Sequence, residues 1–228
     1  MLKRLRDRLF RRNASPFRGQ VGQDLWVIET LGGKRGGFFV EIGATDGVSY
    51  SNTYGLEREL GWTGICIEPN PREQAQLRKN RKCTLVQALC SSEAGRTLTF
   101  QIDGTLSGVR ETAGGMMREN KEALSMTTTT LAQVLTDNGA PHLIDYLSLD
   151  VEGHELDVLS GLWPSPFKFR CITVEHNEPH QGPAMRMALR ERLQANGYRF
   201  VKGNDDVRNW GHGPIDDFYV IDDPSLVR

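Results

Sequence analysis

Short apolar runs alternate along the chain with stretches whose apolar residues recur at helical spacing. Runs such as residues 38–42 lack polar alternation, which is typical of strands covered by helices on both faces. Strands followed by helices, repeated in this order, predict an α/β fold with a doubly wound sheet. The predicted strands are residues 38–42, 62–68, 84–90, 97–102, 144–150, 171–175, 198–201 and 217–221. The predicted helices are residues 25–31, 51–60, 71–80, 131–138 and 184–196, and a further helix that follows residues 151–155 and ends near residue 162.

The turn after the first strand carries the pattern E-x-G-x-x-x-G, from Glu41 through Gly43 to Gly47. Glycine permits a tight turn and a close approach of a ligand to the backbone. A strand, a glycine turn and a helix form the nucleotide-binding start of many α/β domains. A dinucleotide fingerprint would need glycine where Thr45 stands, so the spacing is instead similar to the first motif of class I S-adenosylmethionine (SAM) methyltransferases.

Polar residues close several other strands. In open α/β sheets, ligands bind beyond the carboxyl ends of the strands. Glu68 ends the second strand and is placed to accept the ribose hydroxyls of a nucleoside, whose base would lie near Gln87 and Ala88. Asp150 and Glu175 close the fourth and fifth core strands. A single acid of this kind can cap a helix, but acids closing three separate strands indicate a ligand site.

Two stretches have no clear period. Residues 103–130 contain glycines, methionines and four successive threonines, and we expect a substrate lid or a disordered insert there. Residues 203–214 are rich in glycine, asparagine and aspartate and are expected to form a loop carrying Trp210 and His212.

Bulk properties narrow the classes of function. The chain has 228 residues and a formal net charge of -1, which argues against bulk attraction to nucleic acid. Its four cysteines show no metal-binding spacing and indicate a reducing compartment. No secretory signal or transmembrane span is visible, so we expect a cytoplasmic protein.

The N-terminus is basic. Residues 1–13 carry six lysines and arginines against Asp7 alone, with leucines at helical spacing. Such an arm could contact a partner or the inner membrane surface, or could simply be a solvated arm. We therefore expect residues 1–18 to form an arm and residues 19–228 to form the enzyme domain.

A family resemblance covers residues 19 to 221. Its motifs are Gln23-Asp24, Glu41 to Gly47, Ser51-Asn52-Thr53, Glu68-Pro69-Asn70, Asp150 to Glu155 and Val174-Glu175-His176. Together they resemble the FkbM family of SAM-dependent methyltransferases. The resemblance implies a seven-stranded, mostly parallel sheet whose last strand is antiparallel. It also implies O-methylation of a sugar, glycan or secondary-metabolite hydroxyl, without identifying the acceptor.

The candidate cofactor-binding residues follow from the glycine loop and the strand ends. They are Glu41, Gly43, Asp46, Gly47, Asn52, Glu68, Gln87, Ala88 and Asp150. Asn52 could instead cap the following helix.

Methyl transfer to a hydroxyl needs in-line positioning and removal of the hydroxyl proton, by a base or by a metal. His154 is the candidate base, although it could merely orient Glu152. Asp150, Glu175 and His176 could alternatively hold Mg²⁺ or Mn²⁺. The catalytic candidates are thus His154, Asp150, Glu152, Glu175 and His176.

Two further classes of function stay open from the sequence. One is a nicotinamide-dependent oxidoreductase, against which the missing glycine at position 45 counts. The other is a non-catalytic SAM-fold module that binds a partner, against which the polar rim counts because buried acids cost desolvation. The oligomeric state is not indicated.

Overall fold

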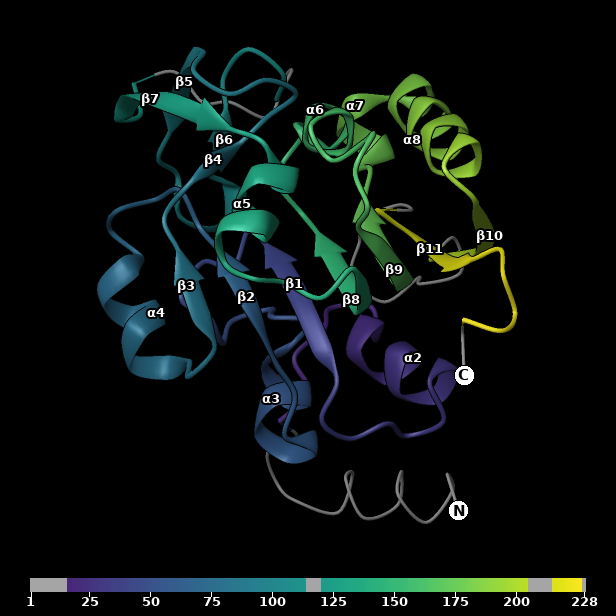
Figure 1. Ribbon diagram of the computed structural model, residues 1–228. Coiled ribbons are helices and arrows are strands. Elements are labelled where there is room, and N and C mark those ends of the chain that lie inside the picture. The colour runs from purple at the N-terminus through teal and green to yellow at the C-terminus, as the bar shows by residue number, and fades with distance from the viewer. Residues whose placement is uncertain (1–15, 114–119, 205–214, 227–228) are drawn as a thin grey trace.

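A computed structural model describes residues 16–113, 120–204 and 215–226 (Figure 1). The predicted basic helix of residues 1–13 lies outside the described residues, as do Trp210 and His212.

The core is a seven-stranded sheet with the order β10-β11-β9-β8-β1-β2-β3. Neighbouring strands from β9 to β3 run parallel, and β11 is antiparallel to both β9 and β10. This confirms the predicted class I methyltransferase sheet with its antiparallel last strand. The strands are β1 (Phe38–Ile42), β2 (Thr63–Ile67), β3 (Thr84–Val86), β8 (Leu143–Leu149), β9 (Lys168–Glu175), β10 (Tyr198–Gly203) and β11 (Asp216–Ile221).

Helices cover both faces of this sheet. Successive strand side chains point to opposite faces, so neighbours such as Phe39 and Val40 join different cores. Val40 packs in the cluster shared with α5, α6 and α8, and Phe39 packs in the cluster shared with α2, α3 and α4. The helices are α2 (Gln23–Thr30), α3 (Tyr54–Leu60), α4 (Gln74–Asn80), α5 (Leu131–Asp137), α6 (Glu155–Ser160), α7 (Glu178–Gln181) and α8 (Pro183–Ala195).

A second sheet of four strands, in the order β4-β7-β5-β6, stands above the main sheet in Figure 1. Its apolar side chains form a separate small core around Phe100 and Val109. Its elements are β4 (Leu89–Cys90), β5 (Thr97–Gln101), β6 (Gly108–Val109) and β7 (Ala123–Thr129), with a 3₁₀ turn, η1 (Gly104–Leu106).

This second sheet corrects two predictions. The strand expected over residues 84–90 is divided, because Leu89 and Cys90 pair with Thr128 and Thr129 of β7 rather than extending β3. The disordered insert that was one of the two expectations for residues 103–130 is also wrong for the described part of this segment, which contains η1, β6 and β7. The threonine run there has the β-branched side chains that favour strands.

None of the described helices combines the length and the apolar character that a bilayer crossing demands.

Candidate functional site

A pocket of about 470 Å³ lies at the carboxyl ends of the central strands. Its floor comes from the residues that end β1, β2, β8 and β9, and one wall comes from the second sheet and its 3₁₀ turn. The lining residues used below are Glu41, Gly43, Asn52, Glu68, Ala88, Phe100, Leu106, Val109, Asp150, Glu152, His154 and Glu175.

The glycine loop makes its closest approach at Gly43. This residue has a φ of 85°, and a β-carbon built on it would lie 1.8 Å from the carbonyl oxygen of Asp150. The backbones that leave β1 and β8 therefore meet at a spacing that only glycine permits. Gly43 lies in the pocket wall, as predicted for a cofactor-binding loop.

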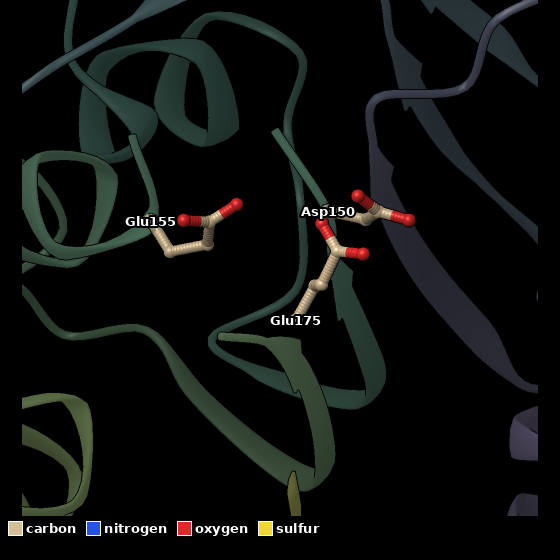
Figure 2. A group of neighbouring side chains, drawn as sticks. All are labelled: Asp150, Glu155 and Glu175. Carbon is tan, nitrogen blue, oxygen red and sulfur yellow. The ribbon is translucent and has the colours of Figure 1, made fainter. Parts of the chain in front are cut away.

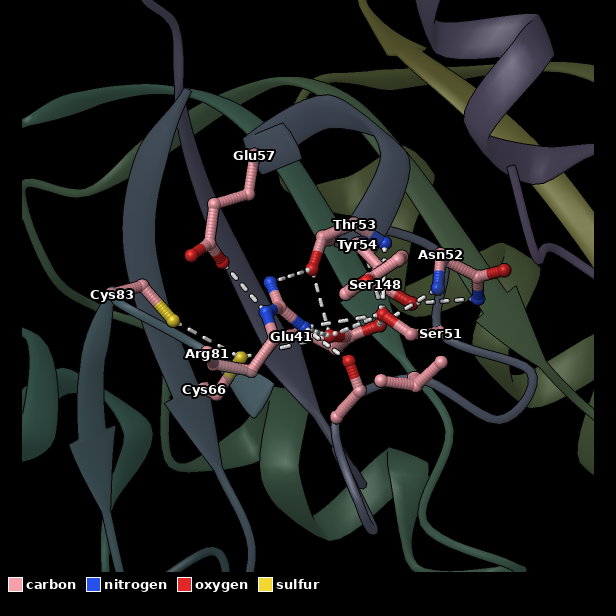
Figure 3. Close-up of polar contacts among 12 residues, drawn as sticks. Glu41, Ser51, Asn52, Thr53, Tyr54, Glu57, Cys66, Arg81, Cys83 and Ser148 are labelled. Atoms are coloured by element: carbon pink, nitrogen blue, oxygen red, sulfur yellow. Dashed lines mark hydrogen bonds and ion pairs between the residues drawn. The ribbon is translucent and has the colours of Figure 1, made fainter. Parts of the chain in front are cut away.

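Glu41 is the centre of a buried polar network (Figure 3). Its carboxylate accepts hydrogen bonds from the Ser51 and Thr53 hydroxyls and from the backbone amide of Asn52. The guanidinium of Arg81, whose side chain is fully buried, forms an ion pair with it at 2.9 Å. Although Glu41 reaches the pocket, its partners are mainly protein groups, and it holds residues 51–53 beside the glycine loop.

This network also explains where α3 begins. Residues 51–53 were predicted to be helical, but their polar groups bond to Glu41 and Arg81, so the helix starts at Tyr54. Asn52, a residue of this segment, is turned so that its amide nitrogen donates to Ser148 Oγ at 2.9 Å. The Asn52 carbonyl oxygen is buried without a hydrogen-bond partner and is available to a ligand.

Glu68 lies immediately after β2, as expected for a ribose-binding acid. One carboxylate oxygen accepts from the amide of Thr45 and the other from the amide of Asn70, both at 2.8 Å. These bonds hold both oxygens in place, and each keeps a lone pair for a ligand hydroxyl. Burial raises the pKa of Glu68 to about 7, against the lowering effect of the two amides.

Three carboxylates gather where β8 and β9 end. One oxygen each of Asp150, Glu155 and Glu175 lies within 4.8 Å of the others (Figure 2). Burial raises the pKa of all three, and Asp150 and Glu175 share a hydrogen bond that requires a proton. Glu155 already accepts from the amides of Val151 and Gly153, whereas Glu175 Oε2 is buried without a partner.

Glu152 projects from the turn after β8. It adopts a left-handed backbone conformation with a φ of 58°, which side-chain-bearing residues rarely take. Its Oε2 has no hydrogen-bond partner although it is buried, and burial raises the pKa of the carboxyl to about 9. The strained turn thus places an unpaired acceptor in the pocket wall.

His154 reaches the pocket from the N-terminus of α6. Both ring nitrogens have hydroxyl partners: Nδ1 lies 2.9 Å from Thr112 Oγ1, and Nε2 lies 3.0 Å from Ser91 Oγ. One nitrogen must accept and the other donate if the ring is neutral. Burial lowers the pKa of His154, which favours the neutral form that a general base needs.

The structure separates His176 from the predicted metal set. Its ring lies near Asp217 of β11, with Nε2 3.6 Å from Asp217 Oδ1, and it is not in the pocket lining. The reason is the strand period, since His176 directly follows Glu175 and consecutive side chains point to opposite sides. His176 is therefore neither a pocket residue nor a ligand partner of Asp150 and Glu175.

Three predicted cofactor residues also lie outside the pocket lining. Asp46 accepts bonds from the amides of Val48 and Ser49, so it stabilises the loop. A β-carbon on Gly47 would collide with Leu77 and Arg81, so this glycine serves packing. Gln87 is exposed, and only its neighbour Ala88 lines the pocket.

Sequence reasoning missed the residues that the second sheet contributes. Phe100, Leu106 and Val109 give the pocket an apolar wall, and Ser91 and Thr112 hold His154. The alternating pattern of β5 indicates a strand, but nothing in it indicates that the strand folds over the rim. Glu155 stood inside the D-V-E-G-H-E motif and could have been included by its position.

Comparisons with known proteins agree with this geometry. Residues 41–200 match the model of the methyltransferase FkbM domain. No curated protein matches the sequence significantly.

Solved structures show the fold. A proposed rRNA methylase from Clostridium thermocellum superposes with a TM-score of 0.50 at 12% identity, covering 90% of this chain and 97% of that one. The methyltransferase FkbM from Methylobacillus flagellatus superposes with a TM-score of 0.49 at 12% identity, covering 80% of this chain and 43% of that one. The precorrin-6y C5,15-methyltransferase from Geobacter metallireducens superposes with a TM-score of 0.48 at 13% identity, covering 87% of this chain and 86% of that one.

Proposed function

The chain belongs to the FkbM family of methyltransferases, and from this premise we propose that it transfers the methyl group of SAM to a hydroxyl of a sugar, glycan or other small acceptor. The observation that carries the proposal is a carboxylate-lined pocket joining Glu68 after β2 to Glu175 at the end of β9. The family favours this reaction over nicotinamide-dependent hydride transfer. Turnover with SAM would exclude a non-catalytic binding module, and the assay described below measures it.

The pocket suits a cationic nucleoside cofactor. Five acidic residues line it, Glu41, Glu68, Asp150, Glu152 and Glu175, and none of the described lining residues is a lysine or arginine. Glu68 would accept the ribose hydroxyls, while the carbonyl oxygen of Asn52 and the carboxylate of Asp150 would face the methionine portion. The carboxylate of Asp150, in a partly buried pocket, would stabilise the sulfonium and ammonium groups of SAM. Bound there, SAM supplies a methyl group that is already activated for attack by oxygen.

In the reaction, the acceptor oxygen forms a bond to the methyl carbon while the bond from that carbon to sulfur breaks. The products are the methyl ether and S-adenosylhomocysteine, and the hydroxyl proton passes to a base. The chain's main contribution is to hold the oxygen in line with that bond. Phe100, Leu106 and Val109 form an apolar side of the pocket.

We assign His154 as the base. It is neutral near pH 7 because burial lowers its pKa, and it lies in the pocket wall. Its ring receives the proton at the nitrogen that accepts from Ser91 or Thr112. That hydroxyl is either displaced from the ring by the acceptor hydroxyl or passes the proton from the acceptor hydroxyl to the ring.

The experiment is a turnover assay of the full chain with SAM and a panel of hydroxyl acceptors, detecting S-adenosylhomocysteine and methylated product by mass spectrometry. Parallel calorimetry with SAM, NAD and NADP identifies the cofactor. Binding of SAM with methyl transfer supports the proposal. Preferential binding of NAD or NADP, or SAM binding with no transfer to any acceptor, contradicts it.

A metal requirement is decided in the same assay. Full turnover in EDTA is expected if His154 removes the proton. Turnover that is lost in EDTA and restored by Mg²⁺ or Mn²⁺ would assign this role to a metal instead.

A further inference from the structure

Two pocket carboxylates have an oxygen that no protein group satisfies. Glu175 Oε2 and Glu152 Oε2 are both buried without hydrogen-bond partners, and Glu175 as a whole is only 7% exposed. Both residues line the pocket, one at the end of β9 and the other on the turn after β8. A buried acceptor without a partner costs free energy, so a ligand donor is the expected partner.

The acidic groups around these oxygens indicate which kind of ligand donor would bind them. Figure 2 shows the Glu175 and Asp150 carboxylates side by side, with Glu155 facing them across the turn. No described lysine or arginine lines the pocket to balance them. While the pocket is empty, burial raises the pKa of these carboxyls, so that they hold protons. A phosphate or carboxylate would find no cation to pair with here, whereas an ammonium group would favour release of those protons and pair with the charge that results. A cationic donor satisfies both the unpaired oxygens and the charge.

The position of this cluster separates it from the nucleoside end of the pocket. Glu68 follows β2 and Glu175 ends β9, and β1 and β8 lie between these strands. Three strand spacings correspond to about 14 Å. A cofactor whose ribose is held by Glu68 therefore leaves the β9 end for the acceptor.

We propose that the acceptor carries an ammonium group close to its reacting hydroxyl, as an amino sugar or another amino alcohol does, and that Glu152 and Glu175 bind this group. This inference rests on the proposed function for the reaction, but the ammonium site itself rests on the two unpaired oxygens. Glu152 and Glu175 are specificity-determining residues in this assignment, and His154 remains the base.

An ammonium group fits the arrangement better than a divalent cation. A metal needs several oxygens converging on one point. Glu152 lies outside the converging group, and Glu155 already accepts backbone amide bonds. The three donors of a primary ammonium can instead bond to acceptors that are more widely spaced, and Glu152 lies near enough to Glu175 that, besides burial, its charge raises the pKa of Glu175.

The test uses the full chain saturated with S-adenosylhomocysteine and calorimetric titration with two matched pairs of probes. Glucosamine is compared with glucose, and ethanolamine with ethylene glycol, with glucose 6-phosphate as an anionic probe. We expect each ammonium probe to bind about tenfold or more tightly than its neutral counterpart. We expect glucose 6-phosphate not to bind.

Substitutions locate the site. Glu152→Gln and Glu175→Gln preserve side-chain shape, and each should reduce glucosamine affinity about tenfold or more while glucose affinity changes little. Glu191→Gln is the matched control, because Glu191 is an exposed carboxylate on α8 outside the pocket lining. The affinity for S-adenosylhomocysteine should be unchanged in all three variants. A large loss of that affinity in Glu175→Gln would assign the site to the cofactor's own ammonium group and overturn the proposal.

Two other results would also overturn it. One is equal binding of the ammonium and neutral probes. The other is Mg²⁺ or Mn²⁺ binding to EDTA-treated protein that Glu175→Gln abolishes. The proposed function is judged separately by turnover with SAM: methylation of neutral acceptors only would retain the methyltransferase and reject the ammonium site. Ammonium binding with no methyl transfer to any acceptor would retain the ammonium site and reject the methyltransferase function.

Discussion

The backbone of Gly43 lies against that of Asp150, so closely that a β-carbon at position 43 would stand 1.8 Å from the Asp150 carbonyl oxygen. Gly43 leaves β1 and Asp150 leaves β8, and these strands are neighbours in the sheet. The contact therefore joins the loop predicted to bind the cofactor with the motif predicted to carry the chemistry. A change at either residue moves the other.

We predict that Gly43→Ala destabilises the protein by more than about 3 kcal/mol, in the range of the largest single-substitution effects. Both the positive φ and the collision with Asp150 oppose a side chain. Gly95→Ala is the control, because Gly95 also has a positive φ but open space around it, and it should cost about 1–2 kcal/mol. Urea unfolding measures both. Equal effects would mean that the close approach is absent in solution.

The position of Gly43 could be predicted from the sequence, whereas the reason for it could not. The sequence indicates a glycine turn that a ligand approaches closely. The structure shows that the first obstacle is the chain's own backbone at Asp150. A contact between two strands distant in sequence has no local signature.

The buried ion pair of Arg81 with Glu41 gives a second prediction. Arg81→Ala should cost about 3–5 kcal/mol, because Glu41 would stay buried without its cation. Arg72→Ala should cost less than about 1 kcal/mol, because the Arg72–Glu122 pair is exposed. Chemical denaturation compares the two variants. An Arg81→Ala protein as stable as Arg72→Ala would show that Glu41 does not depend on this pair.

Glu68→Ala should weaken SAM binding by about 1–3 kcal/mol and leave a folded protein. The carboxylate that would accept the ribose hydroxyls is lost, and the amides of Thr45 and Asn70 lose their acceptor as well. Calorimetry measures the affinity and circular dichroism verifies the fold. Glu73→Ala is a control nearby, since Glu73 does not line the pocket. Unchanged SAM affinity in a folded Glu68→Ala protein would remove the ribose assignment.

The pocket acids predict the pH dependence of stability without ligand. Burial raises the pKa of Glu68 and Glu155 to about 7 and that of Glu152 to about 9, from 4.5. Between pH 4.5 and 9 the folded state therefore holds protons that the unfolded state has released, and the free energy of unfolding falls as pH rises. Denaturant titrations from pH 5 to 9 measure this.

The variant Glu152→Gln separates the contributions. In this variant the free energy of unfolding should fall less steeply near pH 9, where Glu152 titrates, and should still fall near pH 7 as in the wild type. Stability that rises with pH over this interval would show that these carboxyls are ionised in the folded protein.

Local sequence patterns predicted which strand ends carry the acids of the site, but they did not predict which neighbouring side chains face the pocket or which other elements line it. The acids that end β2, β8 and β9 could be placed at one edge because parallel strands end together. His176 was assigned with Glu175, but the alternation of side chains along a strand turns it toward Asp217 instead. The wall from Phe100 and Val109 depends on how the second sheet folds over the rim, which is a tertiary property.

His154→Ala should retain SAM binding but reduce turnover by a factor of about 10² to 10⁴, the usual contribution of a positioned base. Since burial lowers the pKa of His154 below its ordinary value of 6.5, the midpoint of the acid-side decline in wild-type turnover should lie below pH 6.5. His142→Ala is the control, because His142 is exposed and outside the pocket lining.

Ser91→Ala distinguishes catalysis from structure. It removes the hydroxyl beside Nε2 and leaves the ring in place, so the lower end of the pH profile should shift while the fold is kept. A purely structural role for His154 would lower the melting temperature of His154→Ala and leave its turnover per folded molecule unchanged. In that case one of the carboxylates at the ends of β8 and β9 would have to receive the proton. Glu152 would be the first to substitute, because its Oε2 is the unpaired oxygen on the turn that leads to His154.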